Sequence, residues 1–152
     1  MNRETATSIA KELQLLKAPN TDVMFHGLSM EPLLAEGDRV QVDPVEIKDI
    51  VIGDIITYRL DDKFPTRRVA EIKLDYLILC CDNWPTVYFH APFTEVLGRV
   101  RARTRDGVTL NCDDPEWEKR KRLALRNFRL ETSEILPVRM KEWVLKRLRN
   151  SK

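Results

Sequence analysis

Ser29 stands in the stretch FHGLSMEPLLAEGD, residues 25–38, where a tight turn could present a reactive hydroxyl. A serine hydroxyl becomes a useful nucleophile only when a neighbouring base takes its proton and backbone donors face the oxyanion that forms. Gly27 permits a close approach of the chain, Met30 could fill a core pocket, and Pro32 fixes the bend. Alternatively, Ser29 only satisfies the hydrogen bonds of the turn. The residues alone leave both interpretations open.

A turn that presents a reactive side chain needs flanking strands to hold it in position. The sequence predicts strands across most of the chain. Short runs rich in Val, Ile, Thr and Tyr alternate with polar turns. The expected strands lie near residues 22–27, 39–45, 54–60, 66–73, 76–82, 96–105 and 108–111, with RDG as a hairpin turn before the last. No helix of a dozen residues separates them, which favours a mostly antiparallel, barrel-like or folded sheet. The expected fold class is therefore mainly β with flanking helices (α+β).

Helical patterns flank these strands at both ends. Apolar residues at helical spacing before Pro19 predict an N-terminal amphipathic helix. Two one-sided apolar stripes, separated by Pro137, predict a helical tail. They consist of Leu123, Leu125, Phe128 and Leu130, and then of Met140, Trp143, Val144 and Leu148. The expected division is an N-terminal helix at 1–20, a β domain at 21–112 and a basic helical tail at 113–152.

Length and composition narrow the class of protein. The 152 residues suit one domain with a core able to hold a site rigidly. Three cysteines, two of them adjacent, cannot form a disulfide framework, which indicates a reducing compartment. Because neither a transmembrane-length apolar run nor a signal-peptide pattern occurs, we expect a soluble, cytoplasmic protein. Metal-ligand spacings and phosphate-binding Gly-rich loops are also missing, so no metal or other cofactor is expected.

The net charge of +2 hides an asymmetry. From Pro115 to Lys152 the chain has twelve Lys or Arg against five Asp or Glu. Such a tail could contact an anionic membrane surface, nucleic acid or an acidic partner, although a solvated helix surface is the other interpretation. No helix-turn-helix pattern or aromatic RNA-binding signature occurs, so no specific nucleic acid is predicted.

Five segments in order carry a family resemblance: GLSMEPLLAEGDRVQVDP, VIGDIITYRL, TRRVAEI, LILCCDNWP and EVLGRVRA. They resemble the Ser-Lys peptidase superfamily that includes signal peptidase I and the self-cleaving LexA-like repressors. The similarity covers residues 25–103 and looks greatest to the soluble bacterial branch without a membrane anchor. It implies a coiled antiparallel β-fold of the signal peptidase/LexA-like type, with Ser29 as nucleophile and its own backbone amide in the oxyanion hole. The ligand that it implies is a peptide or protein substrate.

Arg67 occupies the position of the general base in this resemblance, followed by Arg68 and Val69. The family has a lysine there or, in some branches, a histidine. A desolvated lysine can lose its proton, whereas an arginine, with a pKa above about 12, stays protonated and has no lone pair to accept one. Arg67 could instead hold a carboxylate, pair with Asp82 or bind a substrate anion. The dyad is therefore expected to be broken unless another group substitutes.

Three groups could substitute as the base. His26 titrates in the right range, but strand alternation would point it away from Ser29, and a surface histidine is the alternative. His90, in the expected loop TVYFHAP, could fold over the site. Lys63, on the turn LDDKFP, could reach it after a register shift, and a solvated turn lysine is the alternative.

Asp82 aligns with the acidic residue of the family's Gly-Asp box, which braces the site, but Cys81 replaces the glycine before it. A buried Cys81 would act as a small apolar residue, and a reactive thiol is the alternative. Asp38 and Asp54, each after a glycine, are interpreted as turn residues.

Three functions follow as hypotheses. The first is a peptide-binding or regulatory protein that keeps the peptidase fold, has lost efficient catalysis and takes a peptide by strand addition. The second is an active serine endopeptidase or self-processing peptidase acting through Ser29. The third is an adaptor whose tail binds nucleic acid or a membrane surface. The first two place Ser29 and Arg67 at the catalytic positions, supported by Met30, Pro32, Arg68 and Asp82.

Overall fold

The computed structural model describes residues 21–134, with side chains from residue 22 to residue 129. The helix expected at 1–20 and the second apolar stripe, Met140 to Leu148, lie outside the described residues. The described part is mainly antiparallel β-sheet with one α-helix, which confirms the predicted mainly β class. Within this part, no helix has the length and apolar composition that a membrane span requires.

Eight strands form one sheet. They are β1 (Thr21–Met24), β2 (Arg39–Asp43), β3 (Ile55–Tyr58), β4 (Thr66–Ile72), β5 (Tyr76–Cys80), β6 (Tyr88–Pro92), β7 (Val96–Arg105) and β8 (Val108–Asn111). The shorter elements are the 3-10 helices η1 (Ile47–Asp49) and η2 (Phe93–Glu95), and the α-helix α2 covers Pro115–Glu134. The strand order is β1-β2-β7-β3-β4-β5-β6, with β8 on β7, and every pair in the described sheet is antiparallel. This pairing agrees with the prediction from the sequence, in which no helix of a dozen residues separates the strands.

The β7–β8 hairpin and strand β6 show where strand prediction succeeds and fails. Arg105 pairs with Val108 across a two-residue turn, as the RDG motif predicts. Residues 88–92, expected as a loop around His90, instead form β6 and pair with β5 along their whole length. That prediction was wrong because β6 is an edge strand in which only Ala91 is fully buried, so the apolar alternation of a covered strand is missing.

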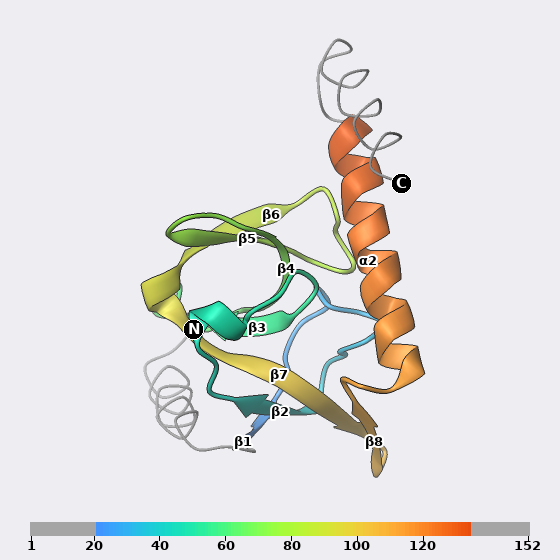
Figure 1. Ribbon diagram of the computed structural model, residues 1–152. Coiled ribbons are helices and arrows are strands. Elements are labelled where there is room, and N and C mark those ends of the chain that lie inside the picture. Colours follow the sequence, from blue (N-terminus) through green and yellow to red (C-terminus); the bar gives the residue numbers. More distant parts are fainter. Residues whose placement is uncertain (1–20, 135–152) are drawn as a thin grey trace.

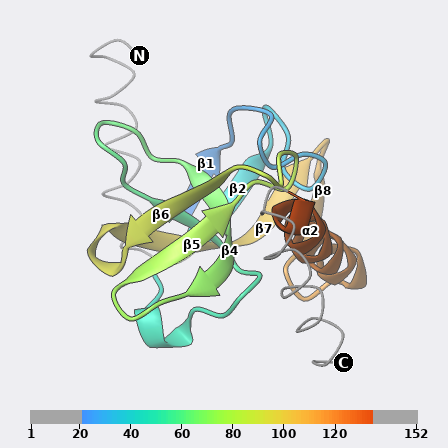
Figure 2. The ribbon, with the colours of Figure 1, turned by 90° about the horizontal axis from the view of Figure 1, so that it is seen from above.

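The sheet curls so that distant strands meet. In Figure 1, β4, β5 and β6 lie at one side of the molecule and β1, β2, β7 and β8 at the other, with α2 along one flank. Seen from above, β5 and β6 pass over β7 (Figure 2). β1 and β4 are separated by three strands in the sheet order, yet residues from both line one cavity. This curling brings the turn after β1 next to β4.

Strand β3 separates two apolar clusters. Ile55 belongs to the cluster under the Ser29 turn and Ile56 to the other, because successive strand residues point to opposite faces. The first cluster contains Phe25, Met30, Leu33, Leu34, Val40, Val42, Ile55, Val100 and Trp117. The second contains Ile50, Ile56, Tyr58, Val69, Leu77, Leu79 and Ala91. The Ser29 turn is therefore anchored in a core of its own.

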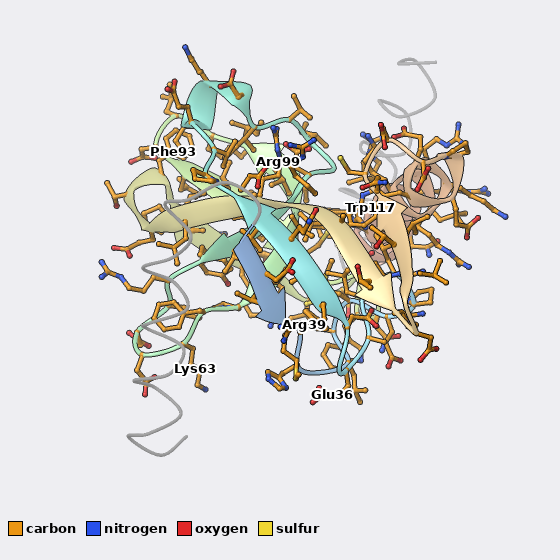
Figure 3. The ribbon with its side chains drawn as sticks, turned by 90° about the horizontal axis from the view of Figure 1, so that it is seen from below. Glu36, Arg39, Lys63, Phe93, Arg99 and Trp117 are labelled. Carbon is orange, nitrogen blue, oxygen red and sulfur yellow. The ribbon has the colours of Figure 1, made fainter. Side chains whose placement is uncertain are left out.

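Helix α2 packs on the first cluster through Trp117, which lies between the helix and the sheet in Figure 3. Ala124, two helical turns after Trp117, is also buried, while Leu125 and Phe128 are half-buried. Leu123 was predicted to share the apolar stripe, but its side chain is 38% exposed. That part of the prediction was wrong because Trp117 sets the phase of the buried face and the small Ala124 continues it.

Candidate functional site

Ser29 lies on the turn that follows β1, and its side chain is buried. The backbone around it is fixed by Asn83, whose amide N–H donates to the Ser29 carbonyl at 2.9 Å and whose Nδ2 donates to the Leu28 carbonyl at 3.0 Å. Gly27 has a φ of +105°, which a residue with a Cβ rarely adopts, and its N–H donates to the Glu36 carboxylate. The turn thus presents Ser29 in one defined position.

The two residues predicted to support the turn take different parts in it. Met30 is fully buried in the first apolar cluster, and its carbonyl accepts a hydrogen bond from the Leu34 amide at 3.0 Å. Pro32 follows a cis peptide bond, and its carbonyl accepts from Arg105 Nη2 at 3.3 Å. Met30 therefore anchors the turn in the core, and Pro32 lies at its outer side.

Arg67 is half-buried on β4, and its side chain contacts Ser29 directly. Its Nη1 donates to Ser29 Oγ at 3.0 Å and to the Thr66 carbonyl at 2.8 Å. The guanidinium also lies over the ring of Phe89, 5.1 Å from its centroid. Two residues 38 positions apart in the sequence therefore form one site.

The direction of this hydrogen bond determines its chemistry. A guanidinium has five N–H donors and no acceptor, so Ser29 Oγ accepts the bond and keeps its own proton. Among the described residues, no group accepts a hydrogen bond from Ser29 Oγ. The contact holds the hydroxyl and places a positive charge beside it, but it removes no proton.

Arg68, the next residue on β4, pairs with Asp82. Its Nε and Nη2 donate to the two carboxylate oxygens at 2.7 and 2.6 Å, and Nη1 donates to the Gly53 carbonyl at 2.8 Å. The side chain of Arg68 is 0% exposed and that of Asp82 is 5% exposed. The alternative in which Arg67 pairs with Asp82 is wrong, because the Arg67 side chain donates to Ser29 and Thr66 and forms no hydrogen bond or ion pair with Asp82. Asp82 in turn fixes the loop from which Asn83 holds the Ser29 turn.

The adjacent cysteines Cys80 and Cys81 are both buried and free. Burial raises the pKa of Cys80 to about 12, and the charge of Asp82 acts in the same direction. Burial also raises the pKa of Cys81, although the positive charge of Arg67 opposes this shift. A reactive thiolate needs the opposite shift, so Cys81 acts as the small apolar residue of the first interpretation.

His26 is a surface histidine, as the second interpretation expected. Its side chain is 67% exposed, and its Nδ1 lies 2.9 Å from Oε1 of Glu36. This hydrogen bond lowers the pKa of Glu36. The alternation argument does not apply to His26, because β1 ends at Met24. His26 lines the same cavity as Ser29, but no hydrogen bond joins the two.

The other two candidate bases also lie away from the hydroxyl. His90 is part of β6, where its ring lies 5.1 Å from that of Tyr76 and 6.1 Å from that of Tyr88. Lys63 is exposed on the β3–β4 turn, where it pairs with Leu60, and Figure 3 shows it at the periphery. In the described part of the chain, Arg67 is thus the one ionisable side chain hydrogen-bonded to Ser29.

Asp38 and Asp54 are turn residues, as predicted. The carboxylate of Asp54 accepts from the Val51 amide at 2.9 Å. That of Asp38 accepts from the Ala35 amide at 2.8 Å and from Nε and Nη2 of Arg105 at 2.8 and 2.7 Å. Burial raises the pKa of Asp38, but these hydrogen bonds outweigh it, so the pKa lies below its usual value. This ion pair holds the far end of the Ser29 loop.

A groove of about 800 Å³ opens beside Ser29. Residues 23–29 and residues 63–67 contribute two continuous stretches of its lining, and Thr57 and Tyr58 of β3 also contribute. Four large apolar side chains of the lining are more than 40% exposed: Met24, Leu28, Leu60 and Trp84. Sequence analysis missed Tyr58, Trp84 and Phe89 as groove residues, because only the curling of the sheet brings them to Ser29.

The edge of β1 borders this groove and pairs with no other strand in the described sheet. Phe25 donates to the Asp38 carbonyl at 2.8 Å and accepts from the Gly37 amide at 3.0 Å, so its backbone groups point toward the β2 side. Because this direction alternates along an antiparallel strand, the N–H and C=O of Met24 point to the free edge. Among the described residues, the Met24 backbone groups therefore have no strand partner beside the groove.

Comparison of the chain with models of known protein families and with curated proteins found no match. Within residues 21–134, no group of three His, Cys, Asp or Glu side chains is placed to hold a metal ion. The chemistry of the site therefore depends on Ser29, Arg67 and the groove.

Proposed function

We propose that this protein is a catalytically impaired relative of the signal peptidase/LexA-like peptidases that binds extended peptides in the groove beside Ser29. One observation carries the proposal: Arg67 Nη1 donates to Ser29 Oγ at 3.0 Å, at the position that the resemblance gives to the base. The curled antiparallel sheet, with the serine on a turn after an edge strand, is consistent with that fold.

The loss of catalysis follows from the acid–base requirements of peptide cleavage. The base must take the serine proton during attack and return a proton to the leaving amine. A guanidinium has no lone pair that could accept the serine proton, so Arg67 can neither take that proton nor pass it to the leaving amine. Its charge would stabilise an alkoxide or an oxyanion, but this electrostatic effect supplies no acceptor for the proton.

Peptide binding is supported by the shape and composition of the groove. A chain added along the free edge of β1 would receive hydrogen bonds from backbone groups such as those of Met24. The exposed apolar side chains Leu28, Leu60 and Trp84 would cover alternate side chains of that peptide. Exposed apolar residues that gather around one groove are typical of a binding site.

The adaptor hypothesis rests on the basic tail. On α2, Lys119, Arg122, Arg126 and Arg129 are exposed at helical spacing along one face. Contact with an anionic surface stays a prediction, because residues 135–152 lie outside the described part of the chain.

Incubation of the full-length protein with a mixed peptide pool, read by mass spectrometry, tests the proposal. We expect no cleavage by the native protein or by Ser29→Ala, with peptides retained by both. Arg67→Lys should gain slow cleavage that Ser29→Ala abolishes in the double variant, because a desolvated lysine can act as the base. Lys63→Gln, which alters an exposed cation of the same groove, is the matched control and should cleave nothing.

Two results would contradict the proposal. Cleavage by the native protein that disappears in Ser29→Ala would make it an active serine peptidase. Failure of the native protein to retain any peptide would exclude peptide binding. If Arg67→Lys binds peptides but cleaves none, the proposed binding function is unaffected. That result would show that the scaffold has lost more than its base.

A further inference from the structure

The groove has cations but no acidic residue in its lining. Arg39, Lys63 and Arg67 line it, together with His26, and no Asp or Glu of the described chain does. Arg67 forms no ion pair with a described residue, its Nη2 has no hydrogen-bond partner there, and its Nε is buried without one. A partly buried cation without a counterion is costly, so a negatively charged ligand would be favoured at this place.

Further donors gather around the Arg67 guanidinium. The hydroxyl proton of Ser29 and the Ser29 backbone N–H have no acceptor among the described residues. The hydroxyl of Tyr58, which also lines the groove, is buried without a partner. Burial raises the pKa of Tyr58, so its hydroxyl stays protonated and able to donate. Carboxylates accept two or more such hydrogen bonds and pair with guanidinium in a bidentate manner.

Ser29, Tyr58 and Arg67, which carry these donors, all line the same groove. The lining includes Ser29 and Arg67, but neither of the residues that follow them, because Met30 and Arg68 are fully buried. The Phe89 ring, over which the Arg67 guanidinium lies, belongs to the same lining. A peptide that lies along β1 and ends at Ser29 would place its terminal carboxylate beside these donors.

We infer that the groove takes the C-terminal end of a peptide chain, with the free α-carboxylate bound by the Arg67 guanidinium and the Ser29 hydroxyl. The inference rests on the proposed function and adds the chemical class of its ligand. Because β1 leads into Ser29, the bound chain runs parallel to β1. An internal peptide segment would place a neutral carbonyl where the site presents a positive charge.

Matched pools of mixed-sequence hexapeptides, one with free C-terminal carboxylates and one with C-terminal amides, test this inference. The full-length protein is titrated with each pool, and retained peptides are quantified by mass spectrometry. Since hydrogen bonds to a charged group are worth more than neutral ones, the native protein should retain the acid form at least about tenfold better than the amide. Arg67→Met should reduce this preference to about twofold or less, and Ser29→Ala should reduce it by a smaller factor.

Lys48→Gln is the matched control, because Lys48 also carries one positive charge but is exposed on η1, outside the lining of the groove. It should keep most of the acid preference. Circular dichroism and thermal unfolding establish that each variant is folded. The comparison of acid with amide on the native protein tests the inference even where a variant fails to fold.

The outcomes separate this inference from the proposed function. Equal retention of acid and amide would overturn the terminal carboxylate and leave peptide binding standing. Retention that depends on Asp or Glu side chains whatever the C-terminus would also overturn it, and so would an acid preference that Arg67→Met leaves unchanged. Retention of neither pool would overturn both the inference and the proposed function.

Discussion

Arg67 and Arg68 are neighbours on strand β4, but the two sides of that strand use them in opposite ways. On the core side, Arg68 is completely buried and each of its three side-chain nitrogens donates a hydrogen bond, two of them to Asp82 and one to the Gly53 carbonyl. On the groove side, Arg67 touches a serine hydroxyl and a carbonyl and has no carboxylate among the described residues. The same residue type is thus a satisfied structural group in one place and an unsatisfied one in the other.

The contrast between Arg67 and Arg68 lies in whether the charge of each has a partner within the folded chain. A buried charge is tolerated when its partner and its hydrogen bonds are complete, and Arg68 meets this condition. A ligand can supply the counterion for a charge that lines a cavity without one, and Arg67 is such a charge among the described residues. The two residues should therefore respond in opposite ways to mutation.

Asp82→Ala should have the largest effect on stability, because it leaves the Arg68 guanidinium buried without a counterion. We expect the free energy of unfolding to fall by about 3–5 kcal/mol. Chemical denaturation monitored by circular dichroism measures the change. The double variant Arg68→Met/Asp82→Leu should lose less than Asp82→Ala alone, since it removes both charges.

A loss below about 1 kcal/mol for Asp82→Ala would show that Arg68 finds another partner. It would also remove the distinction between the two sides of β4, because Arg68 would then behave as Arg67 does.

The sequence predicted the strands better than it predicted the different roles of Arg67 and Arg68. Strands such as β7 and β8 carry alternating residues and a clear turn, so their positions follow from local physics. Strand β6 was missed because an edge strand with Ala91 as its one fully buried residue lacks that alternation. On α2, the composition predicted a helix, but the buried face depends on the contact of Trp117 with a core that no local pattern describes.

The Ser29 site also depends on contacts that local sequence patterns do not predict. The position of Ser29 on a turn follows from its neighbours, but its contact with Arg67 spans 38 residues and was indicated by the family resemblance, not by spacing. Whether Arg67 or Arg68 pairs with Asp82 depends on which face of β4 each one occupies. The register with β5 settles this, since Arg68 lies opposite Cys80 and close to Asp82.

Asp38→Asn should have an intermediate effect, because Arg105 is 37% exposed whereas Asp38 is 3% exposed. Solvent can rehydrate the arginine, so we expect a loss of about 1–3 kcal/mol at neutral pH. The folded-state pKa of Asp38 is lowered, so its stabilisation is present above the unfolded pKa of about 4 and is lost as the pH falls through the folded pKa.

Denaturant unfolding of the native protein and Asp38→Asn, at steps from pH 7 to pH 3, measures this dependence. The difference between the two proteins should stay constant down to about pH 5 and shrink below that. A difference that grows on acidification would contradict the assigned shift and place the charged form of Asp38 in an unfavourable environment.

Arg67→Met should have the smallest effect on stability and thereby complete the contrast with Arg68. The substitution removes hydrogen bonds to Ser29 and to the Thr66 carbonyl, but it also removes a partly buried cation without a described counterion. These contributions oppose each other, so the free energy of unfolding should change by less than about 1 kcal/mol in either direction. Denaturant unfolding beside Asp82→Ala measures it under identical conditions. A loss above about 2 kcal/mol would mean that Arg67 is a structural residue like Arg68. In that case its charge would already be balanced within the folded chain, and the Arg67 guanidinium would not be available to a ligand.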